Sequence, residues 1–273
     1  MKSKECCKEE RGKTVVFSFH KENPKGVILI VHGLGEHFGR YETLCREFNE
    51  HQFSVYGLDL QGHGQSVGKR GAGRFQVFFR QIGLVLEKIR SKYPSVPIGL
   101  FGHSLGGLVS IRFLEENPGE FYCLVASAPA VRLSAENRKK AQGLKPLASL
   151  LPFVTLENGI QTPQLSRNPR IVEDYVNDPL VHSRISLGLA WDMFNEGNKA
   201  FEKVNTIKIP TLLTFGTEDA LVPPEGVKDL FQKLEPAEKH LIAYPGGFHE
   251  LFFDPEHGEQ FRGDIIGWFR RFL

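Results

Sequence analysis

Short runs of apolar residues alternate with amphipathic stretches along most of the chain. The run Val-Ile-Leu-Ile-Val at 27–31 is continuously apolar, as in a strand covered on both faces. Apolar residues within 76–92 recur at helical spacing and predict an amphipathic helix. By the same criteria we predict strands at 53–58, 98–101, 122–126, 211–215 and 240–244, and helices at 40–51 and 105–116. This alternation predicts an α/β protein with a mostly parallel sheet and helices on both faces.

The alternation stops between residues 131 and 206, where no convincing strand is found and five prolines divide the sequence. A structureless loop of that length is uncommon inside a compact domain, so we predict an inserted helical cap. The chain then divides into an N-terminal segment with the first strands (1–25), the first part of the α/β core (26–130), the cap (131–206) and the second part of the core (207–273).

Apolar residues at roughly helical spacing lie in the first third of this cap. They are Leu144, Leu147, Leu150, Leu151 and Val154. One interpretation is an exposed apolar face that makes transient contact with a membrane surface. The other is that these side chains pack on the domain below, and Gly143 and Pro146 favour it because they interrupt a clean amphipathic helix.

Composition excludes several classes of protein. Lys+Arg 34 against Asp+Glu 32 leaves a net charge of +2, which gives no electrostatic basis for binding nucleic acid. The apolar run 27–31 is far shorter than the roughly 20 residues of a membrane span, and the polar N-terminus does not resemble a secretory signal. The cysteines at 6, 7, 45 and 123 have no metal-binding spacing. We therefore expect a cytoplasmic protein with free thiols, with Cys6 and Cys7 near a tail.

The motif Gly-His-Ser-Leu-Gly at 102–106 matches G-x-S-x-G. It lies between a predicted strand and a predicted helix, which is the context of a nucleophile elbow. The glycines leave room for the sharp turn around Ser104, and unpaired N–H groups at the start of the helix favour a developing negative charge. Ser104 is therefore the candidate nucleophile.

A serine hydroxyl needs a base and an orienting carboxylate to act as a nucleophile. In this architecture the acid and then the histidine follow the serine, on loops after later strands. Asp219, in the turn after 211–215, is the candidate acid, with Glu218 as its neighbouring rival. His249 follows the last predicted strand and is the candidate base, whereas His257 fits a surface position at the front of the terminal helix.

Acyl transfer also needs two backbone N–H donors for the oxyanion. The amide of Leu105, directly after the nucleophile, is the first candidate, and the amide of Leu34, in the loop after strand 27–31, is the second. We expect His32 to fix this loop by hydrogen bonds. The glycines at 12 and 33–35 complete neither a P-loop nor a dinucleotide fingerprint, so the sequence does not predict a nucleotide site, and the loop 62–66 is given no chemistry.

With these motifs the sequence resembles the α/β-hydrolase family, and more narrowly the monoacylglycerol lipases and their lysophospholipase relatives. The resemblance extends from about residue 26 to the C-terminus. Its most specific stretches are 32–41, 62–66, 102–107, 165–168 (Leu-Ser-Arg-Asn) and 177–180 (Asn-Asp-Pro-Leu). Because the last two lie in the cap, the match extends beyond motifs that all such hydrolases share.

The resemblance implies a serine esterase that removes one fatty acyl chain from a glycerol head, with no metal and no organic cofactor. It also implies that Glu36 and Arg40 help to form a polar pocket for glycerol. One departure concerns Phe252, which stands where mammalian members carry a second histidine that contacts glycerol. A lysophospholipase or broad carboxylesterase with the same catalytic residues remains an alternative, as does a catalytically silent ligand-binding protein. The sequence leaves the oligomeric state open.

Overall fold

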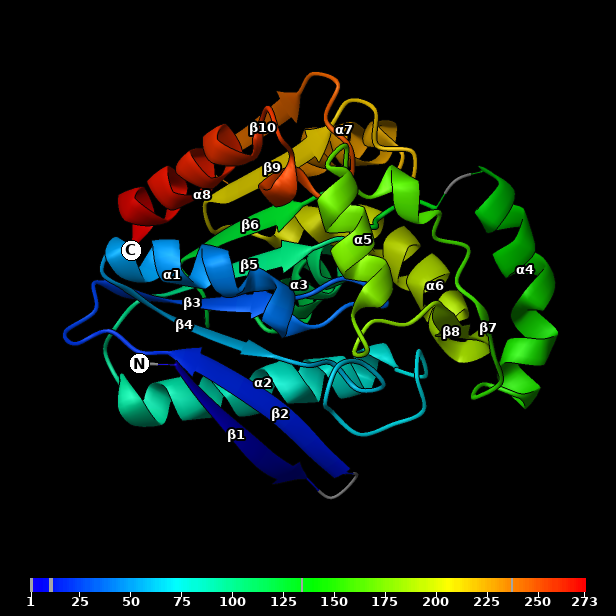
Figure 1. Cartoon of the computed structure of the whole chain (residues 1–273), viewed down its shortest axis with the longest axis horizontal. Helices are drawn as coiled ribbons and strands as arrows, with labels where there is room; N and C mark the ends of the chain where they lie inside the picture. Colours follow the sequence, from blue (N-terminus) through cyan, green and yellow to red (C-terminus); the bar gives the residue numbers. More distant parts are fainter. Residues whose placement is uncertain (1, 10–11, 134, 237) are drawn as a thin grey trace.

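The computed structural model describes residues 2–9, 12–133, 135–236 and 238–273. An eight-stranded sheet forms its centre (Figure 1). The strands are β1 (Lys2–Glu9), β2 (Gly12–Phe19), β3 (Gly26–Val31), β4 (Phe53–Leu58), β5 (Ile98–His103), β6 (Cys123–Ser127), β9 (Thr211–Gly216) and β10 (Lys239–Tyr244). Their order in the sheet is β1-β2-β4-β3-β5-β6-β9-β10. The pairs β1–β2 and β2–β4 are antiparallel and all other neighbouring pairs are parallel, which confirms the predicted mostly parallel α/β sheet.

Helices cover both faces of this sheet. The helices α1 (Glu42–Glu50) and α8 (Gly258–Phe272) pack on one face, and α2 (Phe75–Lys92), α3 (Leu105–Glu116) and α7 (Pro224–Lys233) pack on the other. Strand β3 is buried along its whole length because its side chains alternate between the two cores. Val27 and Leu29 join the core beneath α2 and α3, whereas Ile28 joins the core beneath α1 and α8. Two-sided burial therefore explains the continuous apolar run.

The N-terminal strands correct one expectation. Cys6 and Cys7 do not lie in a tail, because they belong to β1 and pair in register with Val15 and Thr14 of β2. Their side chains lie outside the description. Of the other cysteines, Cys45 and Cys123 are buried, and neither forms a disulfide with another described residue.

The segment 131–206, which we call the cap segment, lies beyond the carboxyl ends of the parallel strands (Figure 1). It consists of α4 (Ala135–Leu150), β7 (Thr155–Glu157), the 3-10 turn η2 (Thr162–Gln164), α5 (Pro169–Asn177), β8 (Arg184–Ser186), α6 (Leu187–Lys203) and the 3-10 turn η3 (Val204–Thr206). It is mainly helical, but β7 and β8 form an antiparallel pair. The expectation that this segment holds no strand was wrong, because three-residue strands are too short to show a period.

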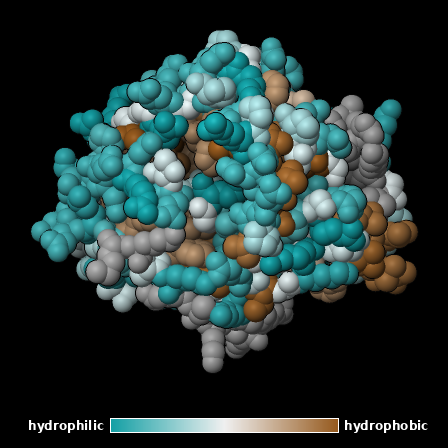
Figure 2. All heavy atoms as spheres, viewed as in Figure 1, coloured by the Kyte–Doolittle hydropathy of each residue, from teal (hydrophilic) through white to brown (hydrophobic). Residues whose placement is uncertain are grey.

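Four apolar side chains at the start of the cap segment face solvent. Leu147 is 50%, Leu150 78% and Leu151 46% exposed, and Val154 is similarly exposed at 41%. The interpretation that they pack on the domain below is therefore wrong for these four, while the side chain of Leu144 lies outside the described residues. Figure 2 shows hydrophobic side chains gathered at the edge of the molecule where α4 and β7 lie. None of the described helices is long and apolar enough to cross a membrane.

Candidate active site

Ser104 lies at the sharp turn between β5 and α3. Its backbone has φ 53° and ψ −118°, a conformation that is strained for a residue with a side chain. The turn closes because Gly102 and Gly106 lack side chains: a Cβ on Gly102 would lie 2.5 Å from the Gly106 carbonyl oxygen, and one on Gly106 would lie 2.1 Å from that of Val31. The elbow predicted from the motif is therefore present, with Ser104 at its tip.

The two predicted oxyanion donors belong to segments that adjoin this serine. Leu105 is the first residue of α3, and Leu34 lines the same cavity as Ser104. Gly33, next to Leu34, approaches the serine so closely that a Cβ there would lie 3.3 Å from the Cβ of Ser104. Within the described part of the chain, the N–H groups of Leu34 and Leu105 donate to no other protein group. Both amides are thus available to a ligand.

Asp219 and His249 meet across the loops that follow β9 and β10. The Nδ1–H of His249 donates to Oδ2 of Asp219 at 2.7 Å. The second carboxylate oxygen, Oδ1, accepts the N–H groups of Leu221 and Val222, each at 2.9 Å. Both partners are buried, and the carboxylate is held from two sides. The ring of His249 is therefore fixed through Nδ1, and Nε2 is the nitrogen that is left to accept a proton.

Electrostatics favours the protonated form of His249. Burial lowers the pKa of its imidazole, but the Asp219 charge and hydrogen bond, with smaller contributions from Glu250 and Glu36, outweigh burial and raise the pKa above its ordinary value. The neighbouring ring of His103 has its centroid 4.8 Å away. Burial and His249 lower the pKa of His103 to about 3, so His103 is neutral at physiological pH and adds no positive charge beside the base.

A cavity of about 250 Å³ opens onto Ser104 and His249. The core contributes Leu34, Leu221 and Val222 to its lining, and the cap segment contributes a larger set of apolar side chains. Those cap residues are Leu133, Leu156, Ile160, Ile185, Leu187, Ala190 and Met193. The cavity is thus apolar along most of its wall and carries reactive groups at the core side, as suits an alkyl chain with one polar end.

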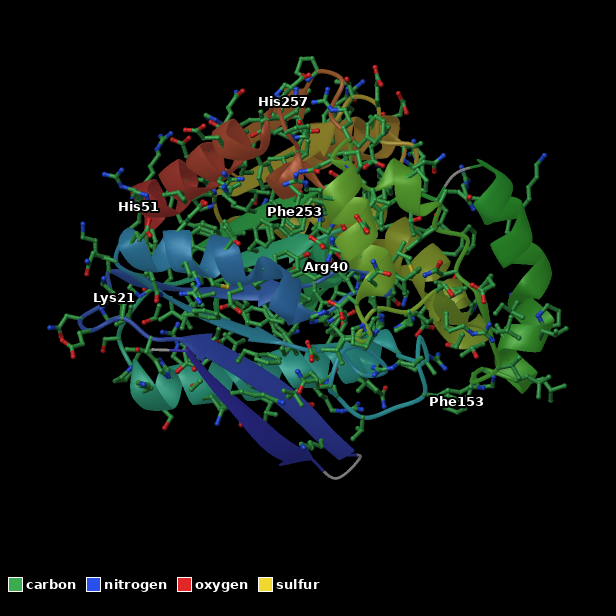
Figure 3. The ribbon with its side chains drawn as sticks, viewed as in Figure 1. Lys21, Arg40, His51, Phe153, Phe253 and His257 are labelled. Carbon is green, nitrogen blue, oxygen red and sulfur yellow. The ribbon has the colours of Figure 1, made fainter. Side chains whose placement is uncertain are left out.

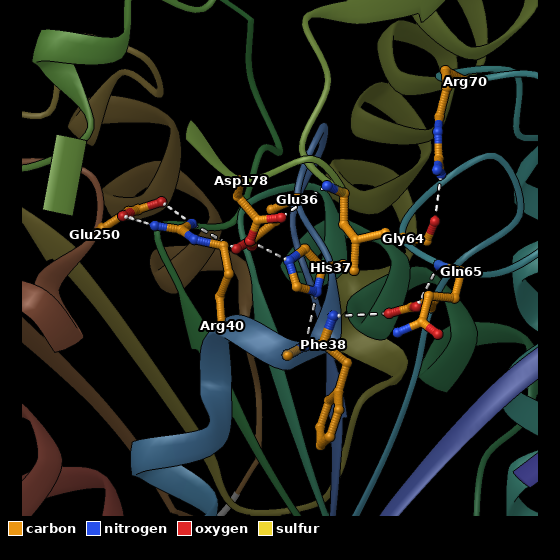
Figure 4. A network of polar contacts seen from close by, with 12 residues as sticks. Glu36, His37, Phe38, Arg40, Gly64, Gln65, Arg70, Asp178 and Glu250 are labelled. Carbon is orange, nitrogen blue, oxygen red and sulfur yellow. Dashed lines mark hydrogen bonds and ion pairs between the residues drawn. The ribbon is translucent and has the colours of Figure 1, made fainter. Parts of the chain in front are cut away.

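Glu36 and Arg40 lie in a buried polar network and not on the wall of this cavity (Figure 4). Glu36 Oε1 accepts the N–H of Gly33 at 2.6 Å and the hydroxyl of Tyr41 at 2.7 Å, and Oε2 accepts from Arg40 at 2.8 Å. Arg40 also donates from both terminal nitrogens to Glu250, at 2.5 and 2.8 Å. The described residues that line the cavity include neither Glu36 nor Arg40, so a direct contact with glycerol stays a prediction.

Sequence reasoning missed Glu250, whose carboxylate completes this network. It also missed the contacts of the network with the cap segment, where Nε2–H of His37 donates to Asp178 at 2.8 Å and the Tyr175 ring lies 4.7 Å from the Arg40 guanidinium. The available signal for Glu250 was its position directly after His249, the candidate base. The pairing of Glu250 with Arg40 could not be predicted from the sequence, since the two residues are 210 positions apart.

The other residues named in the sequence analysis lie in loop hydrogen bonds, in aromatic packing or at the surface. His32 accepts the N–H of Leu60 at Nε2 and donates from Nδ1 to the Gly33 carbonyl, which fits the loop-fixing role expected for it. Phe252 is buried and stacks on Tyr41 with 5.1 Å between ring centroids, so its position is filled by aromatic packing. Glu218 is exposed, and His257 bonds the Pro245 carbonyl away from the cavity. Among the described residues no three His, Cys, Asp or Glu side chains form a group that could hold a metal ion.

A mostly parallel sheet with a strained serine turn after its central strand, and with an Asp–His pair on the loops after two later strands, defines an α/β hydrolase. Comparison with known proteins agrees. The family model described as serine aminopeptidase, S33, matches residues 22–256. The monoacylglycerol lipase of Mycolicibacterium smegmatis is 31% identical over 90% of this chain and 88% of its own length.

Two further relatives are named for the same activity. The human monoglyceride lipase is 33% identical over 84% of this chain and 76% of its own length. The crystal structure of Paleococcus ferrophilus monoacylglycerol lipase superimposes with a TM-score of 0.89 and 38% identity, over 94% of this chain and 98% of that one. The chain therefore belongs to the S33 family of α/β hydrolases, and it is a carboxylic ester hydrolase.

Proposed function

We propose that this protein hydrolyses monoacylglycerols to a free fatty acid and glycerol, with Ser104 as nucleophile, His249 as base and Asp219 as its orienting acid. The observation that carries the proposal is the apolar cavity that opens onto both Ser104 and His249. A single acyl chain fits such a cavity, and its ester carbonyl would then lie beside the serine. The names of the relatives support the same substrate class.

In the first half of the reaction, Ser104 Oγ attacks the ester carbonyl carbon while its proton passes to Nε2 of His249. Nδ1–H of the same ring stays bound to Asp219, which stabilises the imidazolium. The carbonyl oxygen gains negative charge and accepts the N–H groups of Leu34 and Leu105. When the tetrahedral intermediate collapses, the bond to the glycerol oxygen breaks and Nε2–H protonates that oxygen.

In the second half, water replaces glycerol. His249 removes a proton from the water as it attacks the acyl-enzyme carbonyl, the same two amides hold the oxyanion, and the proton returns to Ser104 Oγ as the fatty acid leaves. The cap segment supplies most of the wall around the acyl chain, so chain-length preference depends on its apolar side chains.

Hydrolysis of paired substrates tests this proposal. Medium- and long-chain monoacylglycerols are compared with lysophosphatidylcholines of the same acyl chain, with Ser104→Ala as the control. We expect faster release of fatty acid from the monoacylglycerols, and a loss of about 10⁴-fold or more in the variant. Equal rates on the lysophospholipids would favour a lysophospholipase or broad carboxylesterase, and turnover that does not depend on Ser104 would overturn the proposed nucleophile.

We also propose that the exposed apolar side chains of the cap segment make transient contact with a lipid surface. Leu150, the last residue of α4, is 78% exposed, and Phe153, three residues further on, is 62% exposed. Helix α4 also carries the exposed basic residues Arg138, Lys139 and Lys145. Figure 3 shows Phe153 at the edge of the molecule. Apolar side chains beside basic ones are the composition of interfacial helices.

Co-sedimentation with lipid vesicles tests this contact. We expect the double variant Leu150→Ser, Phe153→Ser to bind anionic phosphatidylserine-containing vesicles more weakly than the wild type. The matched control is Tyr122→Ser, because Tyr122 is 54% exposed but lies outside the cap segment. Equal binding by the double variant and the wild type would contradict the proposal.

A further inference from the structure

Arg40 joins two buried carboxylates that come from distant parts of the chain. It lies in the 3-10 turn η1 (Phe38–Tyr41) and donates to Glu36 on one side and, through two hydrogen bonds, to Glu250 on the other. The side chains of Glu36 and Glu250 are 3% and 2% exposed, and that of Arg40 is 8% exposed. Hydrogen bonds between ionised partners in such surroundings are strong and directional, so the guanidinium fixes both carboxylates relative to one another.

Each carboxylate is attached to a loop that takes part in the proposed chemistry. Glu36 accepts the N–H of Gly33, and Gly33 directly precedes Leu34, a proposed oxyanion donor. Glu250 directly follows His249, the proposed base, and its own N–H donates to the carbonyl of Leu165 in the cap segment. Arg40 therefore forms the link between the oxyanion loop and the loop of the base.

The surroundings of Arg40 restrict its guanidinium to this arrangement. Its central carbon lies 4.7 Å from the Tyr175 ring centroid and 5.2 Å from that of Phe253. Figure 3 labels Arg40 and Phe253 near the middle of the view. Because a guanidinium is planar with several fixed N–H donors, it can bind two carboxylates while it contacts both rings, and a lysine ammonium does not match that geometry.

The same network sets part of the charge around His249. The ionisable groups that face His249 are Asp219, which is hydrogen-bonded to it, Glu250, Glu36 and the neutral His103. Two carboxylates against one guanidinium leave a net negative charge in the network, which favours a protonated imidazole. The network therefore combines a geometric link with an electrostatic influence on the base.

We propose that Arg40 is a positioning residue that holds the Leu34 amide and the His249 ring in register by binding Glu36 and Glu250. The proposal rests on the proposed esterase function and gives Arg40 a role other than contact with the glycerol head. A displacement of about 1 Å between such groups can lower the rate about 100-fold, so a link between two loops has a measurable catalytic effect.

Steady-state kinetics of three variants tests this role. The variants are Arg40→Met, Arg40→Lys and Glu250→Gln, and each is assayed on a monoacylglycerol and on a p-nitrophenyl ester of the same acyl chain. We expect kcat to fall on both substrates, about 100-fold for Arg40→Met and about 10-fold for the two conservative changes, with KM within about twofold of wild type. Because the nitrophenyl ester has no glycerol, an equal loss on both substrates identifies positioning.

The pH dependence of kcat/KM gives a readout that a packing role would not change. The acidic limb reports the protonation of His249 in the free enzyme. Glu250→Gln removes a negative charge and should move this limb to lower pH, whereas Arg40→Met removes a positive charge and should move it to higher pH. Arg40→Lys keeps the charge and should leave the limb in place.

The matched control is Arg46→Met, which removes an exposed arginine from α1 with its own carboxylate partner, Glu42. It should keep wild-type kcat, and thermal unfolding of every variant checks that it is folded. If Arg40→Met does not fold, Arg40→Lys and Glu250→Gln carry the test. A rise in KM confined to the monoacylglycerol would overturn the proposal in favour of glycerol binding, and so would wild-type kcat and pH limbs in the variants. A wild type without turnover of either ester would overturn the proposed function itself.

Discussion

Arg40 and Arg112 are both buried and each binds more than one carboxylate, and they differ in where those carboxylates come from. The Arg40 cluster, formed with Glu36 and Glu250, joins two loops beside Ser104 and His249. The Arg112 cluster lies on α3. Arg112 binds Glu115 and Glu116, which follow it by three and four residues on the same helix. It also binds Glu196 of α6 in the cap segment. Only the first cluster joins groups that are proposed to act in the reaction.

The two clusters also differ in the protonation of their buried glutamates. Burial would raise the pKa of Glu36, but Arg40 and the hydrogen bond from Tyr41 reverse the shift and lower it. Burial raises the pKa of Glu115 to about 7 despite its contact with Arg112, and Glu115 Oε1 has no hydrogen-bond partner among the described residues. At Glu36 the charge of Arg40 and its neighbours thus outweighs burial, whereas at Glu115 burial outweighs the charge and the hydrogen bond of Arg112.

The largest expected effect is on stability at Arg112. Arg112→Met leaves Glu115 and Glu196 without their buried cation, so we expect a loss of about 3–5 kcal/mol in the free energy of unfolding. Urea denaturation measures this loss. Because the cluster is outside the candidate site, kcat of the folded fraction should match the wild type. A fall in kcat as large as that of Arg40→Met would remove the distinction between the two clusters.

The next effect distinguishes the clusters by pH. The pKa of Glu115 is raised from 4.5 to about 7 in the folded protein, so the unfolded state ionises first and stability falls as pH rises from 4.5 through 7. Glu115→Gln removes this dependence. The change that it causes in the free energy of unfolding should be more stabilising at pH 8 than at pH 4, by at most about 3 kcal/mol. Urea denaturation at the two pH values measures the difference, and an equal effect at both would contradict the shift.

Glu36→Gln should show the opposite dependence. The pKa of Glu36 is lowered from 4.5 in the folded state, so its ionised form contributes stability above pH 4.5 that is lost as pH falls through the folded pKa. We expect the variant to be destabilised by about 2 kcal/mol at pH 7 and by less at acidic pH. Denaturation curves at pH 7 and pH 3 test this, and a constant difference would show that Glu36 acts through packing alone.

The smallest effect is expected at an exposed ion pair. Arg46 and Glu42 form an i,i+4 pair on α1, and the arginine side chain is 66% exposed. Arg46→Met should change the free energy of unfolding by no more than about 0.5 kcal/mol at any pH from 4 to 8, because solvent screens the pair. Thermal or urea unfolding provides the measurement. A larger change would mean that burial does not explain the contrast between the two clusters and the surface.

Much of the fold followed from local pattern. The six predicted strands are all present, and five of them are runs that the sheet buries on both faces, whereas the edge strand β10 is only partly buried. The serine motif also predicted its own geometry, since the elbow requires glycines at 102 and 106. The order of serine, acid and histidine then pointed to Asp219 and His249, which the structure brings into hydrogen-bond contact.

Features that depend on distant partners could not be predicted in this way. Strands β7 and β8 have three residues each and exist because they pair with one another. The exposure of Leu147 and Leu150 depends on how α4 is placed against the rest of the molecule, and a helix with Pro146 inside it was not expected. The local pattern of residues predicts neither the pairing of β7 with β8 nor the exposure of α4, because both are set by packing between elements.

The amino-acid sequence by itself determined the α/β class, the elbow at Ser104 and the order of the candidate catalytic residues, because spacing and turn chemistry are local properties. Only the tertiary structure decided that Arg40 binds Glu250, that Phe252 is packed on Tyr41, and that the cap segment closes an apolar cavity over the serine. Each of these depends on a contact between residues far apart in the chain. The energy of such a contact depends on burial, and burial arises only when several segments pack together.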